Sequence, residues 1–315
     1  MRDGFDREVR YLRISVTDRC NLRCRYCMPA HGVPLCTHDE ILSFEEIRAI
    51  VVAAAGLGVR KLRLTGGEPL VRRDVTELVG MLSSVPGIEE VAMTTNGTLL
   101  APLAAELRAA GLSRLNLSID TLDPARYGRL SRGGSLADAL AGLDAACAAG
   151  FTGTKLNCVL IGGINDDEIR RLAELAYDRD LSMRFIELMR MGECAAWPRE
   201  RFVSADAVLE AVPELVPAGA DGVSETYRAP GWRGTVGLIR PMTHRFCGSC
   251  DRIRLTSDGR LKPCLHSAFE VDLRGLEGEQ LACALRRGIA GKPAGHRMDA
   301  GHASEAGRSM NEIGG

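Results

Sequence analysis

The stretch TDRCNLRCRYC, residues 17–27, places three cysteines within eight residues. Cys20, Cys24 and Cys27 follow a C-x3-C-x2-C spacing, and no further cysteine or histidine follows at a spacing typical of metal ligands. A structural zinc site closes around four ligands, so three thiolates would leave one coordination position open. The stretch is therefore either an incomplete structural site or a site whose open position has a function.

The composition of the 315-residue chain is that of an ordinary globular protein, with 45% hydrophobic and 26% charged residues. Its length allows one large domain and a smaller one. The formal net charge of -1 predicts no general attraction to nucleic acid or to a membrane surface. The longest apolar run, Ala49–Val59, is too short to span a bilayer, and the charged N-terminus lacks the apolar core of a signal peptide. We therefore expect a cytoplasmic protein.

Eleven cysteines are many for such a chain, and clustered cysteines in a reducing compartment bind metal more often than they form disulfides. A second group, Cys247, Cys250 and Cys264, follows a C-x2-C-x13-C spacing. The other five are isolated. Among these, Cys147 lies on the leucine-lined face of a helical pattern, where we expect a small buried core residue.

Strand and helix patterns alternate over the first two thirds of the chain. Ser43 and Glu46 form a capping-box signature ahead of one helical pattern, and Ser135 precedes another. Six β-α units of roughly 30 residues predict a parallel sheet, either open and doubly wound or part of a barrel. The expected strands are Tyr11–Val16, Lys61–Leu64, Val91–Thr94, Leu115–Ile119, Lys155–Leu160 and Met183–Leu188.

The pattern then changes, and we expect a first domain over residues 1–198 and a second over residues 199–315. The second contains a predicted β-hairpin, in which Arg252–Thr256 and Arg260–Pro263 flank an Asp-Gly turn. The stretch Ala218–Trp232 has no pattern that we can interpret.

Polar or glycine-rich motifs follow the expected strands at their carboxyl ends, where active residues of parallel α/β folds collect. The first strand leads into the cysteine loop, and the second ends in TGGEP, where Gly66 and Gly67 allow a backbone to approach a ligand closely. Three thiolates suit a 4Fe–4S cluster whose fourth iron stays open, and zinc is the alternative.

The second cysteine group also allows two interpretations. His266 lies two residues after Cys264 and could complete a zinc site of three cysteines and one histidine, since alternate residues of an extended segment share a face. The count of three cysteines repeats that of the first group, which favours a second 4Fe–4S cluster with its own open iron.

Five basic residues lie in apolar strand patterns. Arg252 and Arg254 are two apart on a predicted strand and therefore share a face. Paired guanidinium groups suit a polyphosphate, and two solvated arginines on a hairpin are the simpler interpretation. Arg13, Arg63 and Lys155 occur within strands, where a charge costs free energy unless it is paired or faces a cavity. Arg13 and Arg63 alternate with Leu and Ile, which predicts that they project into a barrel lumen.

The first cysteine motif, with Tyr26 between its last two cysteines, and the downstream GGEP resemble the radical S-adenosylmethionine (SAM) superfamily. Further blocks resemble the GTP 3′,8-cyclase family, which acts in molybdenum cofactor biosynthesis. They are YLRISVTDRCNLRCRYCMP, KLRLTGGEPLVRRD, TTNG, LNLSIDTLD, KLN, RFIELM, FCGSCDRIRLTSDGRLKPCL and the C-terminal IGG. The resemblance extends from about Tyr11 to Gly315. It implies an α/β fold, an incomplete (β/α)6 TIM-like barrel with a C-terminal α+β domain that carries a second Fe–S cluster.

The resemblance also implies the cofactors and the site. Two 4Fe–4S clusters would bind SAM and the guanine base of GTP through their open irons, and the terminal Gly314 and Gly315 would enter the active site and support cyclisation. The implied residues are Cys20, Cys24 and Cys27 for the first cluster, Cys247, Cys250 and Cys264 for the second, Tyr26, Gly67, Ser118 and Met189 for SAM, and Arg13, Arg63, Thr94, Lys155, Arg252 and Arg254 for GTP.

In the implied reaction, a 5′-deoxyadenosyl radical derived from SAM abstracts H3′ of GTP, and the C3′ radical adds to guanine C8. The resulting aminyl radical is then reduced and protonated. The product is (8S)-3′,8-cyclo-7,8-dihydroguanosine 5′-triphosphate, on which a cyclic pyranopterin monophosphate synthase acts next. The implied electron donor is a protein such as flavodoxin or ferredoxin. No nucleic-acid or membrane partner is expected. For the oligomeric state, a monomer and a homodimer are both compatible with the sequence.

Two other functions compete with this one. One is another radical SAM enzyme with an auxiliary-cluster domain, of the peptide maturase type, although such enzymes usually carry more auxiliary cysteines. The other is a non-enzymatic zinc module in which both cysteine groups are structural. Cys36, Cys194 and Cys283 have no place in the implied ligand set.

Overall fold

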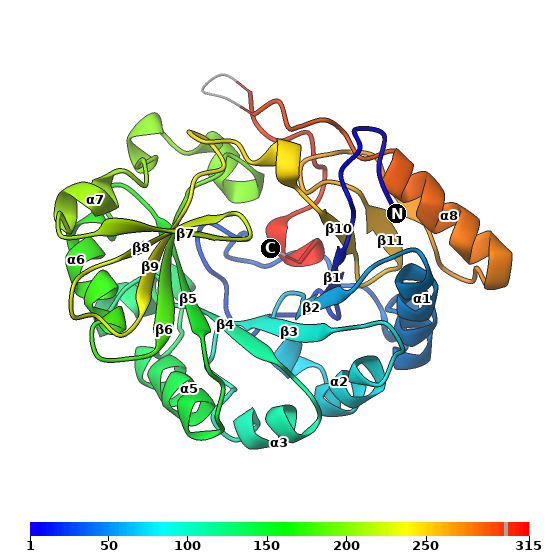
Figure 1. Cartoon of the computed structure of the whole chain (residues 1–315), viewed down its shortest axis with the longest axis horizontal. Helices are drawn as coiled ribbons and strands as arrows, with labels where there is room; N and C mark the ends of the chain where they lie inside the picture. Colours follow the sequence, from blue (N-terminus) through cyan, green and yellow to red (C-terminus); the bar gives the residue numbers. More distant parts are fainter. Residues whose placement is uncertain (299–301, 315) are drawn as a thin grey trace.

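The computed structural model describes residues 1–298 and 302–314, and its main feature is one continuous curved sheet (Figure 1). The described strands follow the order β12-β11-β10-β1-β2-β3-β4-β5-β6-β9-β8-β7. Six of them are parallel neighbours in chain order, which confirms the predicted parallel sheet. They are β1 (Tyr11–Ser15), β2 (Lys61–Thr65), β3 (Glu90–Thr95), β4 (Arg114–Ser118), β5 (Thr154–Leu160) and β6 (Leu181–Glu187).

Helices connect these strands and cover the outer face of the sheet (Figure 1). They are α1 (Phe44–Gly56), α2 (Val75–Ser83), α3 (Ala104–Ala109), α4 (Pro124–Ser131), α5 (Leu136–Ala148) and α6 (Ile169–Ala173). The predicted capping box of α1 is confirmed, because the Ser43 hydroxyl accepts from the Glu46 N–H and the Glu46 carboxylate accepts from the Ser43 N–H. Within residues 1–298 and 302–314, no helix has the length and apolar character needed to cross a membrane.

The strands sort apolar and charged side chains to opposite faces. Leu12, Ile14 and Leu62 are fully buried in the core beneath the helices. Because successive residues of a strand point to opposite faces, Arg13 and Arg63 lie on the inner face of the barrel, in register on β1 and β2. The alternation seen in the sequence therefore separates a hydrophobic outer layer from a charged interior.

The C-terminal part extends the sheet at both edges. Strand β9 (Thr235–Ile239) lies parallel to β6, and β10 (Arg252–Leu255) lies parallel to β1. The predicted hairpin is confirmed, because β10 pairs antiparallel with β11 (Arg260–Lys262), and β12 (Val271–Asp272) and α8 (Gly278–Ala290) pack beside it. The sheet thus runs on past residue 198, and the domain boundary expected there stays a prediction.

The uninterpreted stretch of the sequence forms most of another hairpin. Strand β7 (Val216–Asp221) pairs antiparallel with β8 (Ser224–Arg228), and β8 in turn pairs with β9. Figure 1 shows the turn of this hairpin pointing from the β9 edge toward the middle of the barrel, whereas α7 (Ala207–Ala211) lies outside. This hairpin brings polar residues to the barrel interior.

The expectation that Cys147 is a core residue is wrong, because the side chain is exposed. The buried stripe of α5 is centred on the small residues Ala139, Gly142 and Ala146. A Cβ at Gly142 would overlap the carbonyl oxygen of Gly97, so α5 packs closely on the loop that follows β3 along this stripe. Leu136 and Leu143 of the leucine-lined face are also buried, whereas Cys147 lies on the solvent side of α5.

Candidate active site

The first cysteine group lies in the loop that follows β1. The loop turns tightly, since the N–H groups of Cys27 and Met28 both donate to the Cys24 carbonyl, at 2.9 and 3.1 Å. The three thiols are free and partly exposed. Burial raises the pKa of Cys20 to about 11, and burial together with the neighbouring Cys20 raises the pKa of Cys27 to about 12. Three close thiolates are therefore favourable only beside a cationic partner such as iron.

Gly67 and Glu68 of the GGEP motif hold this loop against the end of β2. The N–H of Gly67 donates to the Thr17 carbonyl and the N–H of Glu68 donates to the Arg19 carbonyl, both at 2.8 Å. A Cβ at Gly67 would overlap the Arg19 carbonyl oxygen. Direct contact between two loops thus accounts for the glycine, and the predicted contact of Gly67 with SAM stays a prediction.

Glu68 connects the end of β3 to the loops that follow β1 and β2. Its buried carboxylate accepts from the N–H of Leu70 at 3.1 Å, the N–H of Asn96 at 2.7 Å and the hydroxyl of Thr95 at 2.7 Å. Burial raises the pKa of Glu68 to about 7 in spite of these bonds. The sequence analysis gave this residue no role, although an acid directly after two glycines at a strand end was a visible sign of one.

Tyr26 anchors the cysteine loop on the opposite side. Its hydroxyl donates to Asp120 at 2.7 Å, and its ring packs against an apolar cluster that includes Leu130 and Leu188. The Cys194 thiol donates to the Tyr26 carbonyl at 3.1 Å, so this cysteine, which had no place in the expected ligand set, supports the loop. Burial raises the pKa of Asp120 to about 6. Asp120 was also missed by the sequence analysis.

The residues expected to contact SAM all lie at the carboxyl edge of the parallel strands. They are Tyr26 after β1, Gly67 after β2, Ser118 at the end of β4 and Met189 after β6. Beside Ser118, the side-chain oxygens of Asn116 and Asn157 are buried and have no hydrogen-bond partner among the described residues. Buried polar atoms are normally hydrogen-bonded, so these two oxygens are available to a polar ligand in the lumen. The four SAM contacts themselves stay predictions.

The second cysteine group lies beside β10 and β11, and the residues around it do not favour a zinc site. His266, the proposed fourth zinc ligand, is buried, contacts the Ser304 hydroxyl at 3.1 Å and packs edge-on against His296. Across the described part of the chain, no three His, Cys, Asp or Glu side chains are grouped so that they could hold one metal ion. Thiolates of an iron–sulfur cube bind separate irons and stand further apart than the ligands of a single ion. Both cysteine groups therefore fit clusters better than zinc.

A buried lysine organises the second group. The ammonium of Lys292 donates to the carbonyls of Arg252 and Pro263, at 2.7 and 2.9 Å, and lies 3.5 Å from the Cys250 sulfur. Burial raises the pKa of Cys250, but Arg252 and Lys292 outweigh it and lower the value to about 7. Lys292 thus stabilises the thiolate form that a metal requires.

Arginines from three adjacent strands meet on the inner face. Arg254 on β10 lies in register with Arg13 on β1, which lies in register with Arg63 on β2. Arg63 donates to the hydroxyl of Thr94 at 3.4 Å. Burial and the neighbouring Arg252 lower the pKa of Arg254 to about 10. So many cations in one enclosed space favour an anionic ligand.

The C-terminal tail reaches these arginines. Figure 1 shows the last described turn of the chain, Met310–Glu312, in the middle of the barrel. The Gly314 carbonyl accepts from Arg13, at 3.3 Å, and from Arg254. Gly314 has a φ of +67°, and a Cβ there would overlap the Thr65 hydroxyl. The structure thus brings Gly314 to the arginines of the inner face. The role of Gly314 in the active site stays a prediction, and Gly315 lies outside the described residues.

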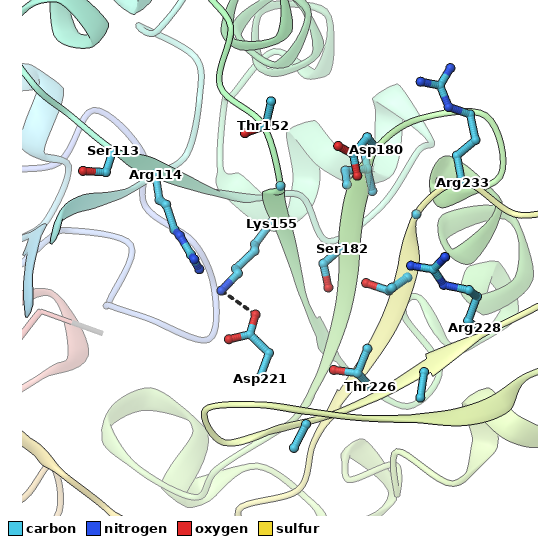
Figure 2. Close-up of a pocket in the computed structure, with 16 residues that line it drawn as sticks. Ser113, Arg114, Thr152, Lys155, Asp180, Ser182, Asp221, Thr226, Arg228 and Arg233 are labelled. Carbon is cyan, nitrogen blue, oxygen red and sulfur yellow. Dashed lines mark ion pairs between the residues drawn. The ribbon is translucent and has the colours of Figure 1, made fainter. Parts of the chain in front are cut away.

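Lys155 lies apart from the arginine group, beside a cavity of about 610 Å³ at the β4–β6 side of the barrel (Figure 2). Its ammonium forms an ion pair with Asp221 at 2.7 Å, and Arg184 on β6 binds the same carboxylate at 2.6 Å. Burial and Arg184 lower the pKa of Lys155 to about 8, and Asp221 opposes this. Burial lowers the pKa of Arg184 against the opposing effect of Asp221, and the charge of Arg63 adds to this lowering, so Arg184 lies between the two basic groups. The sequence analysis missed Arg184, which is a charge in an apolar strand just as Arg13 is.

This combination of barrel, cysteine loop and C-terminal strands matches known proteins. Residues 14–176 match the model of the Radical SAM superfamily, and residues 181–298 match that of Molybdenum Cofactor Synthesis C. The GTP 3′,8-cyclase of Alkaliphilus metalliredigens (strain QYMF) is 48% identical over 320 residues, with 100% of both chains covered. The chain belongs to the GTP 3′,8-cyclase family. Another member, from Moorella thermoacetica (strain ATCC 39073 / JCM 9320), is 46% identical over 329 residues, again with 100% of both chains covered.

Two solved structures of low sequence identity share the fold of this chain. Streptococcus suis SuiB bound to precursor peptide SuiA superposes with a TM-score of 0.62 at 14% identity, covering 89% of this chain and 67% of that one. Methylornithine synthase (PylB) gives a TM-score of 0.51 at 18% identity, covering 67% and 63%. At these identities the likeness concerns the fold alone. The predicted fold, a radical SAM barrel with a C-terminal domain of the molybdenum cofactor synthesis type, is confirmed.

Gly67→Ala should selectively weaken the first cluster site, because the added Cβ displaces the backbone that precedes Cys20. With four irons per cluster, the expected iron content falls from about eight toward about four per chain. Gly56→Ala is the matched control, since a Cβ at this position meets no atom within 4 Å. Iron and sulfide analysis of anaerobically purified protein measures both, and a full iron complement in Gly67→Ala would contradict the role of this loop contact.

Lys292→Met should weaken the second cluster site, since it removes the cation beside Cys250 and leaves two buried carbonyls without a donor. Loss of such an outer partner typically lowers metal affinity about 10- to 100-fold. Chelator competition followed by electron paramagnetic resonance would show selective loss of one of two cluster signals. Lys61→Met, at an exposed position, controls for loss of charge, and equal retention of both signals in the two variants would refute the assignment.

Proposed function

We propose that this chain is a radical SAM enzyme that converts GTP to (8S)-3′,8-cyclo-7,8-dihydroguanosine 5′-triphosphate, the first step of molybdenum cofactor biosynthesis. The observation that carries the proposal is the pairing of Arg13 with Arg254 on the inner face of the barrel. This pair lies where the strand leading to the first cysteine group adjoins the strand that follows Cys250. A nucleoside triphosphate is an anion that suits this position.

Each cysteine group would hold one 4Fe–4S cluster. Cys20, Cys24 and Cys27 would hold the first, which, when bound, supplies the electron that cleaves SAM to methionine and a 5′-deoxyadenosyl radical. The loop contacts of Gly67 and Tyr26 keep these three thiols in place. Cys247, Cys250 and Cys264 would hold the second cluster, and Lys292 keeps Cys250 in its thiolate form.

The basic residues of the lumen would bind the triphosphate. Guanidinium groups can bind phosphate oxygens through two parallel hydrogen bonds, and the ammonium of lysine acts as a compact charge. Binding on the inner face would also remove the phosphates from water, which strengthens each of these contacts. The residues concerned are Arg13, Arg63, Lys155, Arg184, Arg252 and Arg254, with the Thr94 hydroxyl beside Arg63.

In the reaction, GTP loses H3′ to the SAM-derived radical, and the C3′ radical forms a bond to guanine C8 at the expense of the C8–N7 double bond. The aminyl radical left on N7 takes up one electron, supplied in the end by the electron donor, and one proton. For this step the chain has to hold ribose and base in a bent conformation, in which C3′ lies close to C8. Phosphates held by the arginines at one end and the base held near the second cysteine group at the other would impose such a geometry. The Gly314 backbone, which contacts Arg13 and Arg254, would close the site around the substrate.

The two competing functions have less support. For the peptide maturase type, the support is a likeness to SuiB bound to precursor peptide SuiA, and at 14% identity this likeness concerns the fold alone. A zinc module would require ligands grouped around a single ion, and the described residues contain no such group.

We further propose a cytoplasmic location, since iron–sulfur thiolates persist in reducing surroundings. The proposed partners are an electron donor such as flavodoxin or ferredoxin and, for the product, a cyclic pyranopterin monophosphate synthase.

Anaerobic incubation of the reconstituted, reduced protein with SAM and GTP tests the proposed function. We expect methionine and 5′-deoxyadenosine to form in step with loss of GTP and appearance of the cyclised triphosphate. Cys24→Ser should abolish SAM cleavage, because the first cluster loses a ligand. SAM cleavage without consumption of GTP would contradict the proposal.

Gly314→Ala should reduce cyclisation strongly. The new Cβ would overlap the Thr65 hydroxyl, and alanine disfavours the positive φ at this position. Misplacement of the tail by about 1 Å can cost about 100-fold in rate, whereas SAM cleavage should be reduced far less. Gly307→Ala, in the same tail but with no atom within 4 Å of its Cβ, is the control. Equal product formation by the two variants would show that the tail has no part in the reaction.

A further inference from the structure

The carboxylate of Asp221 occupies an unusual position for a residue on an exposed hairpin. A single oxygen, Oδ2, lies 2.7 Å from Lys155 Nζ and 2.6 Å from Arg184 Nη2 (Figure 2 shows the pair with Lys155). The side chains of these two cations are 7% and 8% exposed, whereas that of Asp221 is 49% exposed. The acid therefore reaches in from the solvent side and neutralises two buried charges.

The hairpin that carries Asp221 is held at its turn. Ser224, paired with Asp221 across the turn, is 1% exposed, and a Cβ at Gly237 would overlap its hydroxyl. The residues of β7 are all exposed, and β7 is an edge strand that pairs only with β8 in the described sheet. The backbone of the turn is thus held through Ser224, while the Asp221 side chain can rotate into solvent with little loss of packing.

Lys155 and Arg184 have to be compensated by some anion at all times. Buried cations without a counterion are strongly unfavourable, so the carboxylate cannot leave unless another anion replaces it. Phosphate oxygens present the same chemistry to ammonium and guanidinium donors as a carboxylate does. The Nε of Arg184 is also buried without a hydrogen-bond partner among the described residues, so Asp221 satisfies this guanidinium only in part.

We propose that Asp221 is an internal substitute for phosphate: its carboxylate occupies the subsite of the terminal phosphates of GTP and rotates out when the triphosphate binds. This inference rests on the proposed function, because it takes GTP as the ligand. The exchange makes binding selective, since a ligand without phosphates cannot compensate Lys155 and Arg184 after Asp221 has left. It also keeps the empty lumen neutralised without an outside anion.

A different role for the same carboxylate would be to remain in place and bind a divalent cation that accompanies the triphosphate, since carboxylates and phosphates together are typical ligands of Mg²⁺. The two roles predict opposite effects of removing the charge. The competing carboxylate lowers the affinity for GTP, whereas a metal-binding carboxylate raises it.

Calorimetric titration of the anaerobically reconstituted holoenzyme decides between these roles. Wild type, Asp221→Asn and Asp180→Asn are each titrated with GTP, with inorganic tripolyphosphate and with guanosine, with and without Mg²⁺. Asp180 lines the same cavity at its exposed rim and controls for the change in net charge. We expect Asp221→Asn to bind GTP and tripolyphosphate on the order of tenfold more tightly than wild type, with the dissociation constant of guanosine unchanged and Asp180→Asn equal to wild type.

Three results would overturn the inference. They are equal affinities of Asp221→Asn and wild type, an equal gain in Asp180→Asn, and a Mg²⁺-dependent loss of GTP affinity in Asp221→Asn. Failure of the wild type to bind GTP would instead refute the proposed function. The tripolyphosphate titrations would still show whether Asp221 competes for an anion subsite.

Discussion

Buried cations on the inner face of the barrel are the constraint on which the rest of the site depends. Charges in such a position are unfavourable unless acceptors or anions surround them. The structure provides one acceptor for each of the two groups of cations. The Gly314 carbonyl accepts hydrogen bonds from Arg13 and Arg254, and the Asp221 carboxylate forms ion pairs with Lys155 and Arg184. Both acceptors come from the C-terminal third of the chain. The C-terminal part thus compensates the charges that the barrel strands bring together.

Extension of the sheet beyond β1 explains how the two cysteine groups come to serve one site. Strand β10 joins β1 as a parallel neighbour, so that Arg254, one residue before the end of β10, lies directly beside Arg13. The first cysteine loop follows β1, and Cys250 precedes β10. Glycines in the GGEP motif let the loop pack on the end of β2, and Tyr26 and Asp120 hold its other side. Backbone contacts, more than side chains, therefore set the positions of the thiols.

Local patterns in the sequence predicted much of this arrangement. Period-two alternation gave the six parallel strands and the inward direction of Arg13 and Arg63, and cysteine spacing gave both candidate cluster sites. Parallel pairing of β10 with β1 joins residues about 240 positions apart and has no local signature, so it could not be foreseen. Asp221 lay in a stretch without periodicity, because its strand is exposed on both faces. The position of Gly314 was expected only from a family resemblance.

Transfer of deuterium from the substrate tests the central claim most directly, because it reports which atom of GTP the lumen presents to the SAM-derived radical. GTP deuterated at C3′ is incubated with reduced holoenzyme and SAM, and the 5′-deoxyadenosine formed is analysed by mass spectrometry. The account predicts that it carries a deuterium atom from C3′. Formation of the same amount of unlabelled 5′-deoxyadenosine would contradict the account.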